Sequence, residues 1–436
     1  MDSNRFTSLA DACRKHGARA DKLEKYLRQG DPPADDLVAL FSRLPPGHGA
    51  RMLDRALAHG VGPKEPDALR AFFAAVEDVP LWLDEGLLDL GSRTYLRCGI
   101  VCGLVMACSC LPLAYRSGAA SKPLMFSSQL IDRAVRRLGE TNRFFLEICA
   151  PDGLKRHSPG WKITVKVRTM HAQMRRLLRQ GRTKPWREAE WGAPVNQMDL
   201  AATSLLFSVS QLRHLRRVGF HFTAAESEGV MHLWRYASHL LGIVPDLNCA
   251  TETEGRGLQQ LLFDAYDGPD DDSIRLTESL MKIAAPALVA AGLPGLLPGD
   301  AHGKPRGPLG RLFRDLAHFL EPRIQSNAFK EQLGQFCYGL SQGILGREFA
   351  ASLRYPPTAW RHTAPALLRS VVAPLEACRR LIPGGTRWAV WIGHSHLRHM
   401  MQTRAFAPRP SFHQLTQPVA LPPGPTAPLG GPTDAK

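Results

Sequence analysis

Helical periodicity is the feature that most constrains this 436-residue chain. Between residues 76 and 250 apolar residues recur every three or four positions, and runs that alternate apolar with polar residues are few. The first spacing is typical of amphipathic α-helices, whereas alternation is typical of half-buried strands. With 44% hydrophobic residues available for a core, the sequence predicts a folded all-α protein.

One predicted helix, 161-WKITVKVRTMHAQMRRLLRQ-180, carries an unusual polar set. Arg168, His171 and Arg175 are three and four residues apart, so a helix places all three on one face among apolar neighbours. Burying an unpaired guanidinium costs several kcal/mol. We therefore expect an anion or a carboxylate to meet these arginines.

Proline and glycine divide the chain into three parts. Residues 1–75 are expected to form a helical extension of short amphipathic helices, residues 76–406 a single large helical domain, and residues 407–436 a disordered tail too rich in Pro and Gly to fold. The predicted breaks fall at 30-GDPPAD-35, 45-PPGHG-49, 60-GVGPKEP-66, 117-SGAASKP-123, 150-APDG-153, 181-GRTKPW-186, 267-DGPDDD-272 and 294–310.

Residues 98–115, CGIVCGLVMACSCLPLAY, contain no charge over 18 positions, which is just long enough for a membrane span. The glycines within the segment favour close packing, so a buried core helix is the preferred interpretation. Nine cysteines without CxxC spacing indicate reduced thiols, and the charged amino terminus lacks an apolar leader. Together these features predict a cytoplasmic protein, with peripheral membrane contact left open.

The net charge of +15 is concentrated in one region, because residues 131–190 carry 15 basic and 6 acidic side chains. An excess of this kind suits a solvated basic face, an anionic cofactor, an anionic membrane or nucleic acid. No zinc-finger, RNP or recognition-helix pattern is present. We therefore expect no nucleic-acid partner.

Common catalytic motifs are missing, including GxGxxG before a helix, a Walker loop, GxSxG, HExxH and CxxCH. Histidines remain as candidates. His394, His396 and His399 are close enough in sequence to bind a metal, although a loop cluster is the simpler interpretation. His171 suits a haem iron ligand flanked by arginines that meet propionates or hold carboxylates, or else it is a satisfied core histidine.

A second helical segment, 136-RRLGETNRFF-145, places Arg137 and Thr141 four residues apart with Glu140 beside them. Taken alone, this is an ordinary amphipathic helix.

The order of several segments resembles the family of latex-clearing proteins (rubber oxygenases) and the mycophenolic-acid-pathway oxygenase. The resemblance covers residues 76–250 and is carried by 79-VPLWLDEGLLDLG-91, the Arg137–Thr141 and Val167–Arg175 segments, 191-WGAPVNQMDL-200 and 231-MHLWRYASHLLGI-243. It implies a non-covalent haem b with His171 as proximal iron ligand. It also implies that Arg137, Thr141, Arg168 and Arg175 belong to the polar haem pocket.

Two positions depart from the family pattern. Glu140 stands where rubber oxygenases can place a distal lysine, and Ser127-Ser128-Gln129 stands in place of a TGR motif. Glu140, with Arg137 and Thr141, becomes the candidate for distal acid–base chemistry, unless it only pairs with Arg137 or Arg143. The resemblance implies an oxygenase that uses dioxygen on a hydrophobic, isoprenoid-like small molecule or polymer. A non-catalytic haem- or lipid-binding protein and a non-haem metal enzyme using the 394–399 histidines are the alternatives.

Overall fold

The computed structural model describes residues 4–126, 130–181, 185–284 and 326–402, with the backbone alone described for 130–137 and 283–284. Throughout these ranges the regular elements are helices, and no strand occurs among them. The predicted all-α fold is confirmed. The expected tail at 407–436, the loop at 294–310 and the Ser127–Gln129 motif lie outside the described residues.

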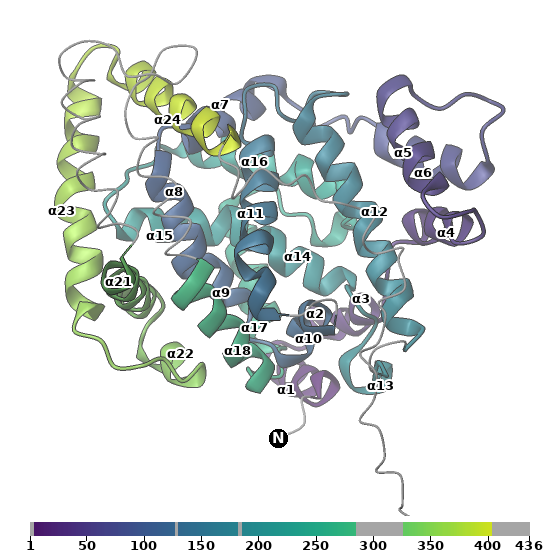
Figure 1. Ribbon diagram of the computed structural model, residues 1–436, viewed down its shortest axis with the longest axis horizontal. Helices are drawn as coiled ribbons and strands as arrows, with labels where there is room; N and C mark the ends of the chain where they lie inside the picture. Colours follow the sequence, from purple (N-terminus) through teal and green to yellow (C-terminus); the bar gives the residue numbers. More distant parts are fainter. Residues whose placement is uncertain (1–3, 127–129, 182–184, 285–325, 403–436) are drawn as a thin grey trace, which may run out of the picture.

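Six helices form the amino-terminal part and run along the outside of the larger helical body (Figure 1). They are α1 (Arg5–His16), α2 (Ala18–Asp21), α3 (Leu23–Arg28), α4 (Pro32–Phe41), α5 (His48–His59) and α6 (Asp67–Glu77). Breaks between them coincide with the predicted ones near residues 30, 45 and 62. In Figure 1, α4, α5 and α6 occupy the right side, and α4 packs along α12.

The central helices enclose most of the core. They are α7 (Glu85–Leu96), α8 (Gly99–Val105), α9 (Leu111–Ala114), α10 (Gly118–Phe126), α11 (Leu130–Ile148), α12 (Pro159–Arg179), α13 (Glu188–Trp191), α14 (Gln197–Leu205), α15 (Gln211–Arg217), α16 (Ala224–Leu240), α17 (Glu252–Asp264) and α18 (Asp271–Ser279). Single π-helical turns at Met106–Cys110, Leu206–Ser210 and Leu280–Ala284 and a 3₁₀ turn at Pro245–Leu247 complete this region.

Helices α7 and α16 pack against each other so closely that glycine is required at the crossing. A Cβ atom added to Gly91 would lie 2.2 Å from the backbone oxygen of Gly229. Beside this crossing, the Phe207 and Trp234 rings stack with centroids 4.8 Å apart, and Phe145 stacks on Trp234 at 5.8 Å. The aromatic cluster fixes α11 against α16, because its large apolar rings are buried together.

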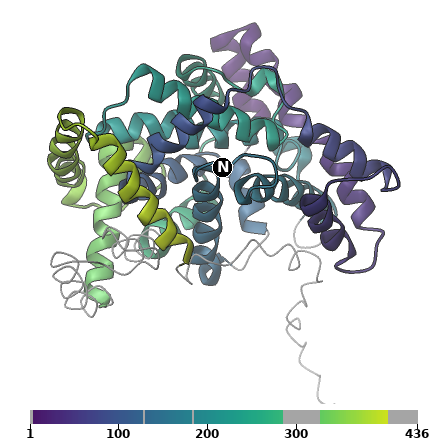
Figure 2. The same ribbon diagram turned by 90° about the horizontal axis from the view of Figure 1, so that it is seen from above.

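The carboxy-terminal helices cover the opposite side from α4–α6, on the left of Figure 1. They are α21 (Asn327–Leu345), α22 (Arg347–Ser352), α23 (Trp360–Leu381) and α24 (Gly385–Gln402). The view from above in Figure 2 shows the same separation, with α24 crossing the left side of the molecule. Buried Arg97, the residue that follows α7, holds α23 in place, with NH1 2.9 Å from Oε1 of Glu376.

The uncharged segment 98–115 is interrupted by the π-helical turn Met106–Cys110, and residues 104–110 are all buried. This agrees with the preferred interpretation of a core segment. Among the described helices none is long and apolar enough to cross a membrane singly. The helical segments Glu85–Leu96 and Gly99–Ala114 reach the length and apolar composition of a membrane span only when taken together, and they meet at a bend of 86°.

One predicted break is shorter than expected and lies earlier. The helices are interrupted at residues 115–117, between α9 and α10, but α10 begins at Gly118 and contains Pro123, so most of the predicted break at 117–123 is helical. The start of α10 is stabilised from a distant part of the chain, since the Ala119 N–H donates to Oδ2 of Asp267 at 3.1 Å and the Gly118 N–H donates to the Gly268 oxygen at 2.8 Å. Local sequence does not reveal caps of this kind.

Candidate functional site

Carboxylates of the chain itself meet the buried arginines of α12. Nε and NH2 of Arg168 bind the two carboxylate oxygens of Asp31 at 2.7 and 2.9 Å, and both side chains are at most 5% exposed. Nε of Arg175 binds Oδ1 of Asp35 at 2.7 Å, and its NH1 donates to the Val195 oxygen at 3.0 Å. The expectation of a carboxylate partner is therefore met by the start of α4.

Close backbone approach surrounds the Arg168–Asp31 pair. Gly242 has a left-handed backbone with φ +79°, and a Cβ there would lie 2.5 Å from Nε of Arg168 and 2.6 Å from Oδ2 of Asp31. Gln197 ties the adjacent segments together, because its Nε2 donates to the oxygens of Gly30 and Gly242, each at 2.9 Å. The ion pair is thus enclosed by backbone and kept from water.

The segment 191-WGAPVNQMDL-200, one of those that carried the resemblance, holds the amino-terminal helices in place. The N–H groups of Ala193 and Gln197 donate to the oxygens of Leu27 and Gln29, both at 2.9 Å. Asp199 forms an ion pair with Arg5, whose side chain is 1% exposed. Its role in this structure is therefore to fasten residues 5–35 to the helices that follow.

Sequence reasoning missed Asp31, Asp35 and Gln197. Both aspartates lie in 30-GDPPAD-35, which was interpreted only as a break between helices. One signal was available in the sequence. Two aspartates four residues apart stand at the start of a predicted helix, and two arginines elsewhere in the chain needed carboxylate partners. Nothing in the local pattern links positions more than 130 residues apart.

His171 lies between the two arginines on α12, and its Nδ1, like NH2 of Arg175, has no hydrogen-bond partner within the described residues. This Nδ1 is also shielded from solvent. Burial, with a smaller effect from the charge of Arg175, lowers the pKa of His171 to about 3. The imidazole is therefore neutral near pH 7 and keeps a free lone pair or N–H, which argues against a satisfied core histidine.

The three candidates on α11 lie on consecutive turns of that helix, which packs against α12. Glu140 and Thr141 are half-buried, and Arg137 is placed by its backbone alone. One of the pairings considered for Glu140 involves Arg143, whose NH2 binds Oε1 of Glu147 at 2.9 Å. The structure thus brings the two predicted helices together, and the roles of Arg137, Glu140 and Thr141 stay predictions.

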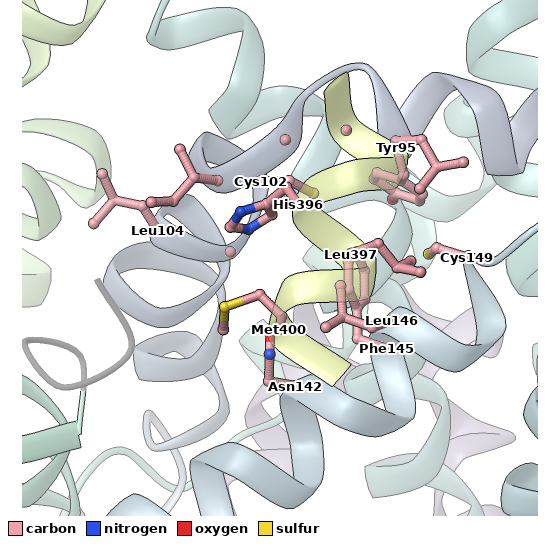
Figure 3. A pocket seen from close by; sticks show the side chains of 15 residues that line it. Tyr95, Cys102, Leu104, Asn142, Phe145, Leu146, Cys149, His396, Leu397 and Met400 are labelled. Atoms are coloured by element: carbon pink, nitrogen blue, oxygen red, sulfur yellow. The ribbon is translucent and has the colours of Figure 1, made fainter. Parts of the chain in front are cut away.

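A small cavity lies between α8, α11 and α24 (Figure 3). Its volume is about 40 Å³, and Cys102, Asn142, Leu146, His396 and Met400 are among the residues that line it. Nδ2 of Asn142 and Nδ1 of His396 are buried without a hydrogen-bond partner among the described residues. A volume of this size accommodates a few atoms, so the cavity is not a haem pocket.

The carboxy-terminal histidines do not form the metal site that one alternative required. They lie on helix α24 and not in a loop, and His394 and His396 are two residues apart, which places them on different sides of the helix. Across the described part of the chain, no group of three or more His, Cys, Asp or Glu side chains is arranged to hold a metal ion. The non-haem metal enzyme is therefore not supported.

The sequence and the fold were compared with known proteins. The profile of the family described as "ER-bound oxygenase mpaB/B'/Rubber oxygenase, catalytic domain" matches residues 90–377, about two thirds of the chain. The chain belongs to this family.

The rubber oxygenase of Streptomyces sp. (strain K30) is 25% identical over 234 residues, which span 53% of this chain and 56% of that relative. The solved structure of latex clearing protein LCP in the closed state matches with a TM-score of 0.58 at 20% identity, covering 87% of this chain and 91% of that one. At this identity the structural likeness shows a shared fold.

Helices α11 and α12, which carry the predicted site, both lie within the residues that match the family profile. The carboxylates that pair with Arg168 and Arg175 lie outside it, as does α24 with its three histidines. The carboxylates that hold the arginines of the candidate site are therefore supplied by a segment that precedes the matched residues.

Proposed function

We propose that this member of the mpaB and rubber oxygenase family is a haem b-dependent oxygenase that acts on a hydrophobic substrate. The observation that carries the proposal is His171, a neutral imidazole with a shielded and unpartnered Nδ1 on the helix that the family resemblance assigns to the proximal ligand. A ligand to iron must be unprotonated, and a pKa of about 3 keeps this imidazole unprotonated throughout the physiological range.

The arginines beside His171 support the proposal through position. Since Arg168 and Arg175 already bind Asp31 and Asp35, they fix the rotation and height of α12 and thereby orient the histidine. Of the two roles that the sequence left open for them, the carboxylate role is the one that the contacts support. Direct contact with haem propionates stays a prediction for both.

When bound, a b-type haem would supply the iron at which dioxygen chemistry takes place. The chain supplies proton handling and an apolar setting. A carboxylate such as Glu140 can accept or donate a proton at its oxygens, and the Thr141 hydroxyl can donate a hydrogen bond. Apolar side chains line α11 on the side of α24, where the cavity of about 40 Å³ holds only a few atoms and is too small for the substrate.

An absorption spectrum tests the cofactor directly. The full chain, produced with haem supplied, is expected to show a Soret band and about one extractable haem per chain, because no CxxCH motif exists to tether it. His171→Ala should lose the haem and retain its helicity, while His59→Ala, at an exposed position on α5, should leave the spectrum unchanged. A full haem content in His171→Ala would show that another residue is the ligand.

Oxygen uptake separates an oxygenase from a carrier. Haem-loaded protein should consume dioxygen when alkenes of increasing length are added, with isoprenoid chains the first substrates to test. A haem protein that binds these alkenes without consuming oxygen would instead be the non-catalytic haem- or lipid-binding protein. Absence of haem under every condition would refute both.

A further inference from the structure

Exposed apolar side chains gather on the outer face of α23 and α24. Along α23, Leu367, Val371 and Leu375 are 51%, 55% and 62% exposed. Their four-residue spacing forms one stripe along the helix. Outside α23, α24 and the corner between them, the large apolar side chains with comparable exposure among the described residues are Val79 and Leu81.

Exposed apolar side chains also occur at the corner after α23 and on α24. Leu381 and Ile382 at the corner are 82% and 59% exposed, and Trp388 and Trp391 on α24 are 62% and 45% exposed. Both views place these two helices on the side of the molecule away from α4–α6 (Figures 1 and 2). The seven side chains together are called the outer apolar face below.

Positive charge accompanies this face. Residues 360–402 contain six arginines against one acidic residue, Glu376. Glu376 is buried and engaged by Arg97 and Arg379. Arg369, Arg380 and Arg387 are exposed and form no ion pair within the described residues. The surface is therefore apolar and cationic at once.

A cleft of about 660 Å³ opens at the corner between the two helices. Ile382, Arg380 and Arg387 line it together with Thr386, and so does Glu226, whose carboxylate is already bound by Arg97. One wall is fixed, because NH1 of Arg379 donates to Oγ1 of Thr386 at 2.8 Å. An opening with two unpaired guanidinium groups next to an exposed isoleucine suits a phosphate that is attached to an apolar chain.

We propose that the outer apolar face docks on an anionic lipid bilayer. Tryptophan side chains are favoured at the boundary between headgroups and acyl chains, exposed aliphatic side chains enter the acyl region, and arginines bind lipid phosphates. The face supplies all three groups in adjoining positions.

Two other partners could cover the outer apolar face, namely a second copy of the chain or a segment of the chain outside the described residues. Charge disfavours both. A second copy of the chain would bring the same arginines against each other across a symmetric interface. Residues 285–325, with five basic and three acidic side chains, and residues 403–436, with three and one, carry the same sign of charge as the face. A bilayer rich in acidic phospholipids carries the opposite sign.

Flotation of the full chain with vesicles tests the proposal. The protein should float with phosphatidylcholine vesicles that contain phosphatidylglycerol and not with phosphatidylcholine alone, and added salt should weaken binding. Arg380→Gln with Arg387→Gln should lower the partition coefficient roughly 30-fold, since each basic side chain near such a surface contributes about 1 kcal/mol. Arg55→Gln, an exposed arginine on α5, should have little effect.

Replacing apolar side chains of the face with serine provides a second test of the proposal. Leu375→Ser with Trp388→Ser should reduce binding at least as strongly, whereas Leu81→Ser, at an exposed leucine outside the face, should not. Cys378 lies on the stripe side of α23 and is the exposed cysteine of this protein, so it can carry an environment-sensitive dye. Its emission should shift to the blue with anionic vesicles, and Cys378→Ser should abolish labelling.

Several outcomes would overturn the proposal. Equal binding to neutral and anionic vesicles, or no binding to either, would show that anionic lipid is not the partner. Dimers that dissociate in Leu375→Ser with Trp388→Ser would assign the face to a second copy. None of these measurements depends on haem, so they remain informative if the proposed oxygenase function fails.

Discussion

The buried pair Arg168–Asp31 should be among the most stabilising contacts between the amino-terminal helices and α12. Asp31→Ala leaves a guanidinium that is 5% exposed without its carboxylate, and Gly242 and Gln197 enclose the site against water. Removing one partner of such a pair typically costs about 3–5 kcal/mol. For a domain stabilised by about 5–15 kcal/mol, this is a large fraction of the free energy of unfolding.

A double-mutant cycle measures the interaction itself. Asp31→Ala, Arg168→Met and the double variant would be unfolded in urea and followed by circular dichroism, with the double variant expected to be more stable than the sum of the single losses predicts. Arg179→Ala is the control on the same helix, because its pair with Glu188 is 44% and 46% exposed and should contribute about 0–1 kcal/mol. If Asp31→Ala costs no more than Arg179→Ala, the account of this pair as a buried lock is wrong.

Four further predictions concern Arg175, Glu140, Gly242 and His214. Arg175→Ala should reduce haem retention far more than Arg176→Ala, which is exposed on the same helix, and equal losses would indicate only a general basic surface. Glu140→Gln should keep its haem and lose turnover by roughly 10²–10⁴-fold, whereas unchanged oxygen uptake would leave Glu140 a structural residue. Gly242→Ala should destabilise the protein in thermal unfolding, since a Cβ would lie 2.5 Å from Nε of Arg168 and φ is +79°, and an unchanged melting temperature would contradict this. Burial, with smaller effects from Arg213 and Arg217, lowers the pKa of His214 to about 3, so the unfolded chain alone takes up this proton as the pH falls from 6.5 towards 3. Stability should therefore fall over this range and fall less in His214→Gln, as measured by urea midpoints at each pH.

Local sequence was sufficient for the helical class and for many element boundaries. Periodic apolar residues and the Pro/Gly breaks at 30–35, 45–49 and 60–66 are local signals, and the structure follows them. The order of short segments was enough to identify the family, which the match over residues 90–377 confirms. Even the demand of Arg168 and Arg175 for carboxylates could be read in the sequence, because buried guanidinium groups are costly without them.

The contacts between residues far apart in the sequence could not be predicted from local patterns. The identity of Asp31 and Asp35 as partners, the cap that Asp267 provides for α10, and the shielding of His171 all depend on which helices pack together. Residues in these contacts are separated by more than 100 positions, so no periodicity connects them. Helix formation follows from neighbours three and four residues apart, whereas burial and charge pairing depend on the surface that each helix meets after folding.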